Sequence, residues 1–494
     1  MKYSLSVILI VLLVGCKQNN EVITTISPPS GEFSAGVKPI FDQHCGTSDC
    51  HGGGPRGFAG GLDLTSYEGI MRGSRYGTVV VPGNVFMSHL IQTINWTDTT
   101  LSPLSSVTMP ASRDPLVQKD IETIVRWVRN GARNDRGEIP FPEPRPAGKV
   151  FFSSQSVDLV GIIDVHTGLI MRYVGVGNAL PFTQPPQAPH NVQIDDQGKY
   201  YYVTMITTGR LKKYDASTNE LLGEVSAGVN PAHAVLTADG SKAYVTNFNN
   251  SVGQVYKIST STMTVDRVIV VPGLLMLGTH GARLSHDGKY LYVGANSSDN
   301  VSIFDTSNDS LVAQVRVVND GRLVSSDYRP YQIAVRSDDR FIYVTLNGNS
   351  PAIGGQGFVS VLERTGNSFA LIDTITVGRL PLQCEVTPDQ RFLYVCNQGS
   401  GSVTVIDAQT NTYSRTIENV GTQPHGIDIN HDSRTVYVTL ENRIQSGEPP
   451  HHPLVGSTMP GFLAVIDVGT QQVVKRIEVG GFAAGVSVYP GKGN

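Results

Sequence analysis

The sequence predicts a small α-helical domain followed by an all-β propeller of seven blades. The first observation behind this prediction is a helical spacing of apolar residues around Trp127, in a segment that Gly131 ends. The second is a proline-rich linker at residues 136–149, which marks a domain boundary. The third is a Tyr-Val pair that then recurs, at Tyr202, Tyr244, Tyr292, Tyr343, Tyr394 and Tyr437.

The composition fits a chain of many short strands and turns. Its 494 residues include 52 glycines, and only 16% are charged. A chain of this length is expected to form two or more domains. The formal net charge of −4 gives no sign of nucleic-acid binding, so we expect no nucleic-acid partner.

The N-terminal segment predicts export. Lys2 precedes an apolar run at residues 5–14, which is too short to span a bilayer and is typical of a signal peptide. The run ends in LVGC, which resembles a bacterial lipobox and implies that Cys16 carries a lipid. An ordinary secretory signal with a stray cysteine is the alternative.

We therefore expect a signal peptide and lipobox at residues 1–16 and a polar tether at residues 17–34. The lipid would anchor the protein to a membrane of a bacterial cell envelope. Lys17 is not the aspartate that favours retention in the inner membrane, so the outer membrane is favoured, with the protein facing the periplasm or the cell surface.

The segment CGTSDCHGGG, residues 45–54, carries the chemistry of the first domain. Cys45 and Cys50 are separated by four residues, and His51 follows at once. Two thiols that form thioethers with a haem, followed by a histidine that binds its iron, predict a haem c attachment site, although the usual spacing is two residues shorter. The alternatives are a zinc site with His44 as a further ligand and a Cys45–Cys50 disulfide.

The surrounding segments resemble a single-haem cytochrome c domain of the kind fused to other modules in bacteria. VKPIFDQHC precedes the motif, and GGLDLTSYEGIMRG, VVPGN, SHLI, MP and IVRWVRNGA follow it in order. We therefore expect a cytochrome c domain over residues 35–135. The resemblance implies that Met109 is the axial ligand opposite His51, an arrangement that suits single-electron transfer. The competing side chains are Met71, Met87 and His89.

From residue 150 onward the chain repeats a unit of four short strands. Successive tyrosines of the Tyr-Val pairs lie 42, 48, 51, 51 and 43 residues apart, each after a turn such as SHDGK. Such units resemble the blades of YVTN-family propellers, a likeness of fold that implies no single function. The first unit lacks its innermost strand and FAAGVSVYP supplies one at the other end. Seven blades are therefore expected within residues 150–494.

Histidines recur in the loops that enter the innermost strands. In propellers these loops share one face, which overlooks the central channel. Imidazole is the usual ligand of copper, zinc and iron, so one hypothesis is an additional metal or second haem held there. The alternative is that the histidines cap the channel and hydrogen-bond neighbouring backbone. The candidate ligands are His190, His233, His280 and His425, with His451 and His452 from a long loop of the last blade.

Two further cysteines lie on adjacent predicted strands of the sixth blade. Cys384 and Cys396 flank the turn TPDQR, so they form either a possible cross-strand disulfide or two buried thiols. The register of the two strands decides, because a slip of one residue turns a side chain to the other face.

These observations predict an exported, membrane-anchored c-type cytochrome that transfers single electrons, with the propeller as a docking or substrate-facing platform. Its partner would be a redox protein or a small-molecule donor or acceptor. One alternative is a propeller-based oxidoreductase that uses the haem as an electron relay. The other is a surface binding propeller without a redox role. The sequence shows no signature of a catalytic triad or of a phosphate-binding loop.

Overall fold

The computed structural model describes residues 31–489 with short gaps. The gaps are residues 54–57, 144–147, 179–184, 250, 272, 274–275, 320, 322–324, 349–353 and 444–459. Cys16, His451 and His452 therefore lie outside the described residues. No helix among the described residues is long and apolar enough to cross a membrane.

The N-terminal domain consists of short helices joined by irregular segments. They are η1 (Phe33–Val37, a π-helix), α1 (Lys38–His44), η2 (Ala59–Gly61, a 3₁₀ helix), α2 (Tyr67–Met71), α3 (His89–Ile94) and α4 (Gln118–Arg129). In the described part of residues 31–143, strand pairing is limited to one bridge between Ser74 and Gly77. The domain is thus helical but mostly irregular, and less clearly all-α than the sequence suggested.

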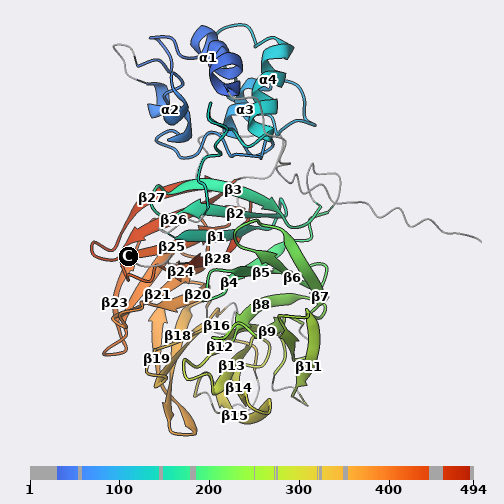
Figure 1. The fold of residues 1–494 in the computed structure, drawn as a ribbon. Coiled ribbons are helices and arrows are strands. Elements are labelled where there is room, and N and C mark those ends of the chain that lie inside the picture. The colour runs from blue at the N-terminus through green and yellow to red at the C-terminus, as the bar shows by residue number, and fades with distance from the viewer. Residues whose placement is uncertain are drawn as a thin grey trace, which may run out of the picture.

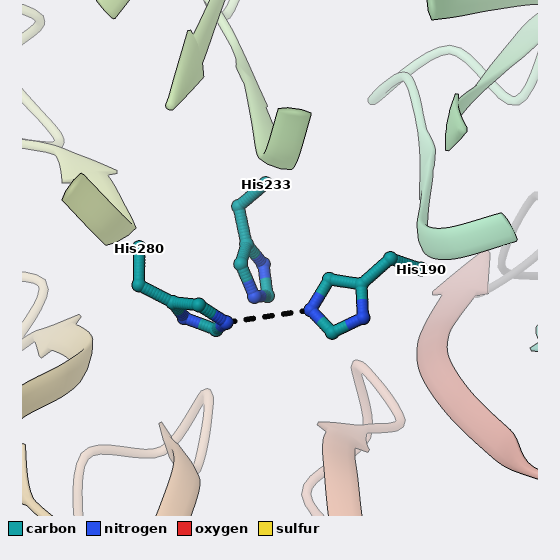
Figure 2. A group of neighbouring side chains, drawn as sticks. All are labelled: His190, His233 and His280. Carbon is teal, nitrogen blue, oxygen red and sulfur yellow. Dashed lines mark hydrogen bonds between the residues drawn. The ribbon is translucent and has the colours of Figure 1, made fainter. Parts of the chain in front are cut away.

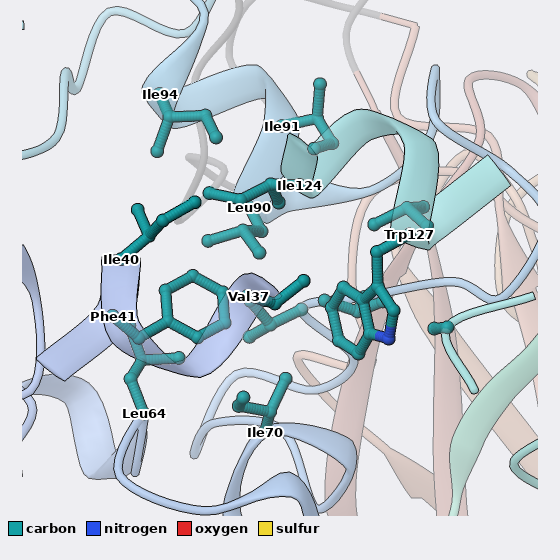
Figure 3. Packing of buried hydrophobic residues seen from close by; sticks show 14 of the residues in the cluster. Val37, Ile40, Phe41, Leu64, Ile70, Leu90, Ile91, Ile94, Ile124 and Trp127 are labelled. Carbon is teal, nitrogen blue, oxygen red and sulfur yellow. The ribbon is translucent and has the colours of Figure 1, made fainter. Parts of the chain in front are cut away.

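These helices surround one hydrophobic core, shown in Figure 3. Helix α4 turns Ile124, Trp127 and Val128 into this core, where all three are fully buried. The apolar residues recur at a helical period, so burial of one face stabilises the helix. Gly131, with a positive φ of 93°, ends the helix as predicted, and its N–H donates to the Val128 carbonyl.

The second domain is a propeller of seven four-stranded sheets, which confirms the predicted number of blades. The order of strands in every blade runs from the innermost outward. Blade 1 comprises β28 (Ala483–Tyr489), β1 (Lys149–Ser154), β2 (Leu159–Asp164) and β3 (Leu169–Gly175); blade 2, β4 (Pro189–Ile194), β5 (Tyr200–Met205), β6 (Arg210–Asp215) and β7 (Leu221–Ser226); blade 3, β8 (Pro231–Leu236), β9 (Lys242–Asn247), β10 (Gln254–Ser259) and β11 (Thr264–Val270); blade 4, β12 (Thr279–Leu284), β13 (Tyr290–Ala295), β14 (Asn300–Asp305) and β15 (Ser310–Arg316).

The remaining three blades follow the same order. Blade 5 comprises β16 (Pro330–Val335), β17 (Phe341–Leu346), β18 (Gly357–Thr365) and β19 (Ser368–Val377); blade 6, β20 (Pro381–Val386), β21 (Phe392–Asn397), β22 (Ser402–Asp407) and β23 (Thr412–Ile417); blade 7, β24 (Pro424–Ile429), β25 (Thr435–Leu440), β26 (Gly461–Asp467) and β27 (Gln472–Val479).

The last strand of the chain closes the ring. Strand β28 pairs antiparallel with β1, so that Val488 lies opposite Val150 and Val486 opposite Phe152. Blade 1 therefore joins the two ends of the repeat region, as the incomplete first unit predicted (Figure 1). Because this closure pairs edge strands that would otherwise be exposed, it protects the sheet from association with other chains.

The Thr that follows most Tyr-Val pairs forms a hydrogen bond to the next blade. The Thr204 hydroxyl donates to the Ala232 carbonyl at 2.8 Å, and Thr345 donates to the Leu382 carbonyl at 2.6 Å. Each acceptor belongs to the innermost strand of the following blade. The repeated motif is therefore explained by packing between blades, since these hydroxyls satisfy backbone groups that are buried in the ring.

Strand register separates the two cysteines of blade 6. Cys384 of β20 lies opposite Val395, so Cys396, the next residue on β21, faces the other side of the sheet. Both are buried free thiols in different core clusters. The possible disulfide is therefore wrong, and the alternative of two buried thiols describes the structure. Cys396 stands where most other blades have the Thr that bonds to the next blade, and its Sγ lies 3.8 Å from the Gly426 carbonyl.

The N-terminal domain packs against the rim of the propeller beside β3 and β27 (Figure 1). Val81 is buried in a cluster with Phe152 of blade 1 and Ile477 of blade 7. The backbone N–H of Ile170 donates to the Thr78 hydroxyl at 2.7 Å. These apolar and polar contacts hold the two domains together.

Candidate functional site

The CGTSDCH segment forms a compact loop at the end of α1. The N–H of Cys45 donates to the Phe41 carbonyl at 2.8 Å, and the N–H of His51 donates back to the Cys45 carbonyl at 3.0 Å. A Cβ on Gly52 would lie 2.2 Å from the Gly46 carbonyl oxygen, so the loop closes only with glycine there. The longer spacing between the cysteines is accommodated by this fold, which brings the two thiols and the histidine onto one loop.

His51 is held as an iron ligand would be. Its Nδ1 lies 3.2 Å from the Leu62 carbonyl. A carbonyl only accepts, so Nδ1 carries the proton and Nε2 keeps its lone pair for a metal. Burial lowers the pKa of His51, which favours the neutral ring that binds iron, although hydrogen bonds to backbone carbonyls oppose the shift.

The two thiols fit haem attachment better than the alternatives. Cys45 and Cys50 are free, not joined as a disulfide. Burial, then the nearby Cys50, raises the pKa of Cys45 to about 11, so its sulfur stays a neutral thiol. His44 instead lies 3.9 Å from the Asp120 carboxylate. Within the described residues, no group of three potential metal ligands gathers around these cysteines, so a zinc site gains no support.

Met109 lies in a loop packed on the same core as Cys45. Its N–H donates to the Thr93 carbonyl at 2.8 Å, and its carbonyl accepts from Trp96 Nε1 at 2.9 Å. These bonds hold the backbone while the thioether stays partly buried. Of the competing side chains, His89 instead lines a pocket between the two domains, with its Nδ1 3.0 Å from the Gln92 side-chain oxygen.

The four channel histidines converge in the centre of the propeller. They come from β4, β8, β12 and β24, and all are buried. Figure 2 shows three of them, His190, His233 and His280, pointing toward one another. The ring centre of His190 lies 5.6 Å from that of His233, 5.4 Å from that of His280 and 5.3 Å from that of His425.

His233 occupies a different place on its strand from His190. The N–H of His233 donates to Thr246, as the N–H of Asn191 donates to Thr204, so His233 is equivalent to the residue after His190. The sequence pattern predicted that the four histidines lie in the loops that enter the innermost strands. The structure places them on those strands and offsets His233 by one residue along the channel.

Backbone and side-chain partners orient these rings. The Nδ1 of His280 donates to the Tyr331 carbonyl at 3.1 Å, and the Nδ1 of His425 lies 2.6 Å from the Glu441 carboxylate. Gln155 contacts the Nδ1 of His190 at 3.0 Å. Sequence reasoning missed Gln155 and Glu441, because each lies on the strand or loop next to its histidine and no local motif marks it.

Two of the four rings keep an unsatisfied nitrogen. The Nε2 atoms of His233 and His425 are buried without a hydrogen-bond partner among the described residues. Each such buried group costs about 1–3 kcal/mol. Burial lowers the pKa of His190 and His233 well below the usual value and that of His280 to about 3, and the neighbouring imidazoles add to each shift. These three rings are therefore neutral and able to bind a cation.

Comparisons with known proteins find a matching family model in each of the two domains. Residues 48–102 match the family model described as Planctomycete cytochrome C, and residues 281–418 match the Choice-of-anchor I domain. The 6-phosphogluconolactonase of Erwinia tasmaniensis is 22% identical over 314 residues, which cover 61% of this chain and 89% of that protein. The class of protein is thus a cytochrome c domain joined to a seven-bladed β-propeller.

Three solved structures are similar to this chain at low sequence identity. A functionally unknown protein from Desulfotomaculum acetoxidans is 15% identical, with a TM-score of 0.51, over 69% of this chain and 98% of its own. Hydrazine synthase of Kuenenia stuttgartiensis has a TM-score of 0.48 at 15% identity, over 60% and 88% of the two chains. Dihydro-heme d1 dehydrogenase NirN has a TM-score of 0.47 at 12% identity, over 92% and 99%.

Proposed function

We propose that this chain is an exported c-type cytochrome that transfers single electrons, with the propeller as a docking or substrate-facing platform. The observation that carries the proposal is the orientation of His51 beside two free thiols, within the segment that matches the cytochrome model. When bound, haem c supplies a one-electron Fe(III)/Fe(II) couple.

The chain's own residues attach and orient that haem. Cys45 and Cys50 would form the two thioethers, and His51 and Met109 would fill the axial positions of the iron. The Leu62 carbonyl keeps the His51 ring in one tautomer, and the Thr93 and Trp96 contacts hold the Met109 loop. With His51 and Met109 both as iron ligands, the site would favour electron transfer over binding of a small ligand.

The test is a pyridine haemochrome assay on protein made in a host with cytochrome c maturation. We expect one covalent haem per chain and its loss in the Cys45→Ser, Cys50→Ser double variant. Met109→Ala should retain covalent haem but lower its reduction potential. A wild-type protein without haem would overturn the proposal and return the propeller to a binding role without redox chemistry.

Export and anchoring form a separate part of the proposal. Cys16, preceded by the apolar run, would be lipidated and would hold the protein at the envelope, with the outer membrane favoured. Labelling of cells with a palmitate analogue tests this step. We expect label in the wild type and none in Cys16→Ala. A variant in which an ordinary secretory signal replaces the lipobox should keep the same haem content.

A second candidate function is an oxidoreductase whose site is the channel of the propeller. The convergence of four buried imidazoles favours it. The haem would then relay electrons to or from that site. Turnover of a small redox substrate that is lost in His233→Ala, with the haem retained, would support this function over the simple carrier.

A further inference from the structure

The channel histidines have the spacing of ligands around one ion. The ligand nitrogens of His190, His233 and His280 lie within 4.8 Å of one another, and the Nε2 atoms of His190 and His280 are 3.4 Å apart. Two imidazole nitrogens bound to one tetrahedral ion, each about 2.0–2.1 Å from it, lie about 3.4 Å apart. The His190 and His280 nitrogens therefore already have the spacing of two ligands of one ion, with the His233 nitrogen within 4.8 Å of both.

The tautomers of the rings fit this role. The Tyr331 carbonyl fixes the proton of His280 on Nδ1, and the Glu441 carboxylate does the same for His425, so each Nε2 keeps a lone pair. The side-chain amide of Gln155 can present its oxygen or its NH₂ to His190, so it serves either tautomer. Metal-binding histidines usually have such a partner on the second nitrogen.

Two unsatisfied ring nitrogens indicate that the cluster can take a cation. The Nε2 atoms of His233 and His425 are buried without a partner among the described residues. A bound ion would accept the lone pair of each Nε2, and His425 adjoins the three-histidine group through His190, whose ring centre lies 5.3 Å from its own.

The close packing of the rings selects a bare ion over a second haem. Ring centres only 4.9–5.6 Å apart leave no width for a macrocycle between them. The carboxylate that contacts the cluster, Glu441, is already paired with Arg443 at 2.6 Å, so it adds little negative charge. Among the divalent first-row metals, imidazole sites bind copper most strongly.

We infer that His190, His233 and His280 bind one copper ion in the channel of the propeller, with His425 as a fourth ligand. Glu441 is a positioning residue that holds His425 through its Nδ1. The inference deepens the second candidate function, the channel oxidoreductase. Metal binding is measured apart from turnover and apart from haem, so either proposal can fail without the other.

The experiment uses full-length, haem-loaded protein treated with a chelator and then titrated with Cu(I), Cu(II) or Zn(II). Elemental analysis should find one copper per chain beside one iron, and X-ray absorption at the copper edge should count three or four imidazole nitrogens. His233→Gln, which preserves much of the side-chain volume, should abolish stoichiometric binding. Glu441→Gln should weaken copper binding about 10- to 100-fold.

The matched controls are His166→Ala and His431→Ala, which remove exposed histidines of the same propeller and should leave copper binding unchanged. Haem absorbance and circular dichroism check that each variant folds. Copper binding that is equal in the wild type and His233→Gln would overturn the site. Tighter binding of zinc than of copper would overturn the choice of metal.

Discussion

At the scale of single residues, one hydrogen bond and one close backbone approach set the conformation of the CGTSDCH loop. The motif predicts from the order of its residues that Cys45, Cys50 and His51 bind a haem. The structure adds the Leu62 carbonyl, which fixes the ring of His51, and the contact between Gly52 and the Gly46 carbonyl, which closes the loop. Neither partner is marked by the motif, because both depend on how the loop folds back.

Gly52→Ala should destabilise the N-terminal domain and reduce haem attachment. The new Cβ would lie 2.2 Å from the Gly46 oxygen, and a clash of this kind typically costs about 1–3 kcal/mol. Thermal unfolding and haem content per chain measure the effect. Gly36→Ala is the control, since its Cβ would meet only Thr123 at 3.7 Å. Equal losses in both variants would count against the loop geometry.

At the scale of elements, the propeller is built from one repeated interaction between neighbouring blades. The Thr of a Tyr-Val-Thr segment reaches the innermost strand of the next blade, as Thr345 does to Leu382. Turns add charged contacts, since Arg364 of blade 5 donates to Asp287 of blade 4 at 2.8 Å. The sequence predicted strands from the repeat, but these contacts between repeats appear only in the closed ring.

Thr345→Val should lower the free energy of unfolding by about 1–3 kcal/mol, because a buried backbone carbonyl and N–H lose their partner while the side-chain shape is kept. Chemical denaturation followed by circular dichroism measures this change. Thr374→Val on β19, the outermost strand of the same blade, replaces an exposed Thr and should change little. A large effect in the control would contradict the assigned cause.

The contact between Asp287 and Arg364 predicts a pH dependence of stability. Burial disfavours the charged carboxylate, but hydrogen bonds from Arg364, Ser285 and the Lys289 N–H outweigh it and lower the pKa of Asp287 to about 2. Because this pKa is depressed in the folded state, the stabilisation is present above the unfolded pKa, near pH 4, and is lost as the pH falls toward 2.

Asp287→Asn should therefore be less stable than the wild type at pH 7, by less than about 1 kcal/mol because the carboxylate is partly exposed. The difference should shrink as the pH falls from about 4 toward about 2. Urea unfolding at several pH values measures it, with Asp373→Asn on the outermost strand β19 as the control. A difference that persists unchanged at the acid end of this range would refute the linkage.

At the scale of the whole molecule, the two domains contact each other beside blades 1 and 7. Val81 enters a core shared by blades 1 and 7, next to the place where β28 closes the ring. The cytochrome domain therefore docks where the two ends of the propeller meet.

Val81→Asp should separate the domains without removing the haem. A carboxylate placed in this apolar cluster would be buried without a partner, so the interface would open. Small-angle X-ray scattering should show a larger radius of gyration, while the haem spectrum stays the same. Val107→Asp, at a position 41% exposed, is the control. An unchanged radius in Val81→Asp would show that the interface does not depend on this contact.

The sequence by itself determined the kinds of domain and the number of blades, and it predicted which groups would bind a haem. Periodicity and spacing are local properties of the chain, so they can be seen without a structure. Only the tertiary structure decided the register that separates Cys384 from Cys396, the offset of His233, and the pairing of His425 with Glu441. Each of these depends on which strands lie side by side, and long-range packing alone sets that arrangement.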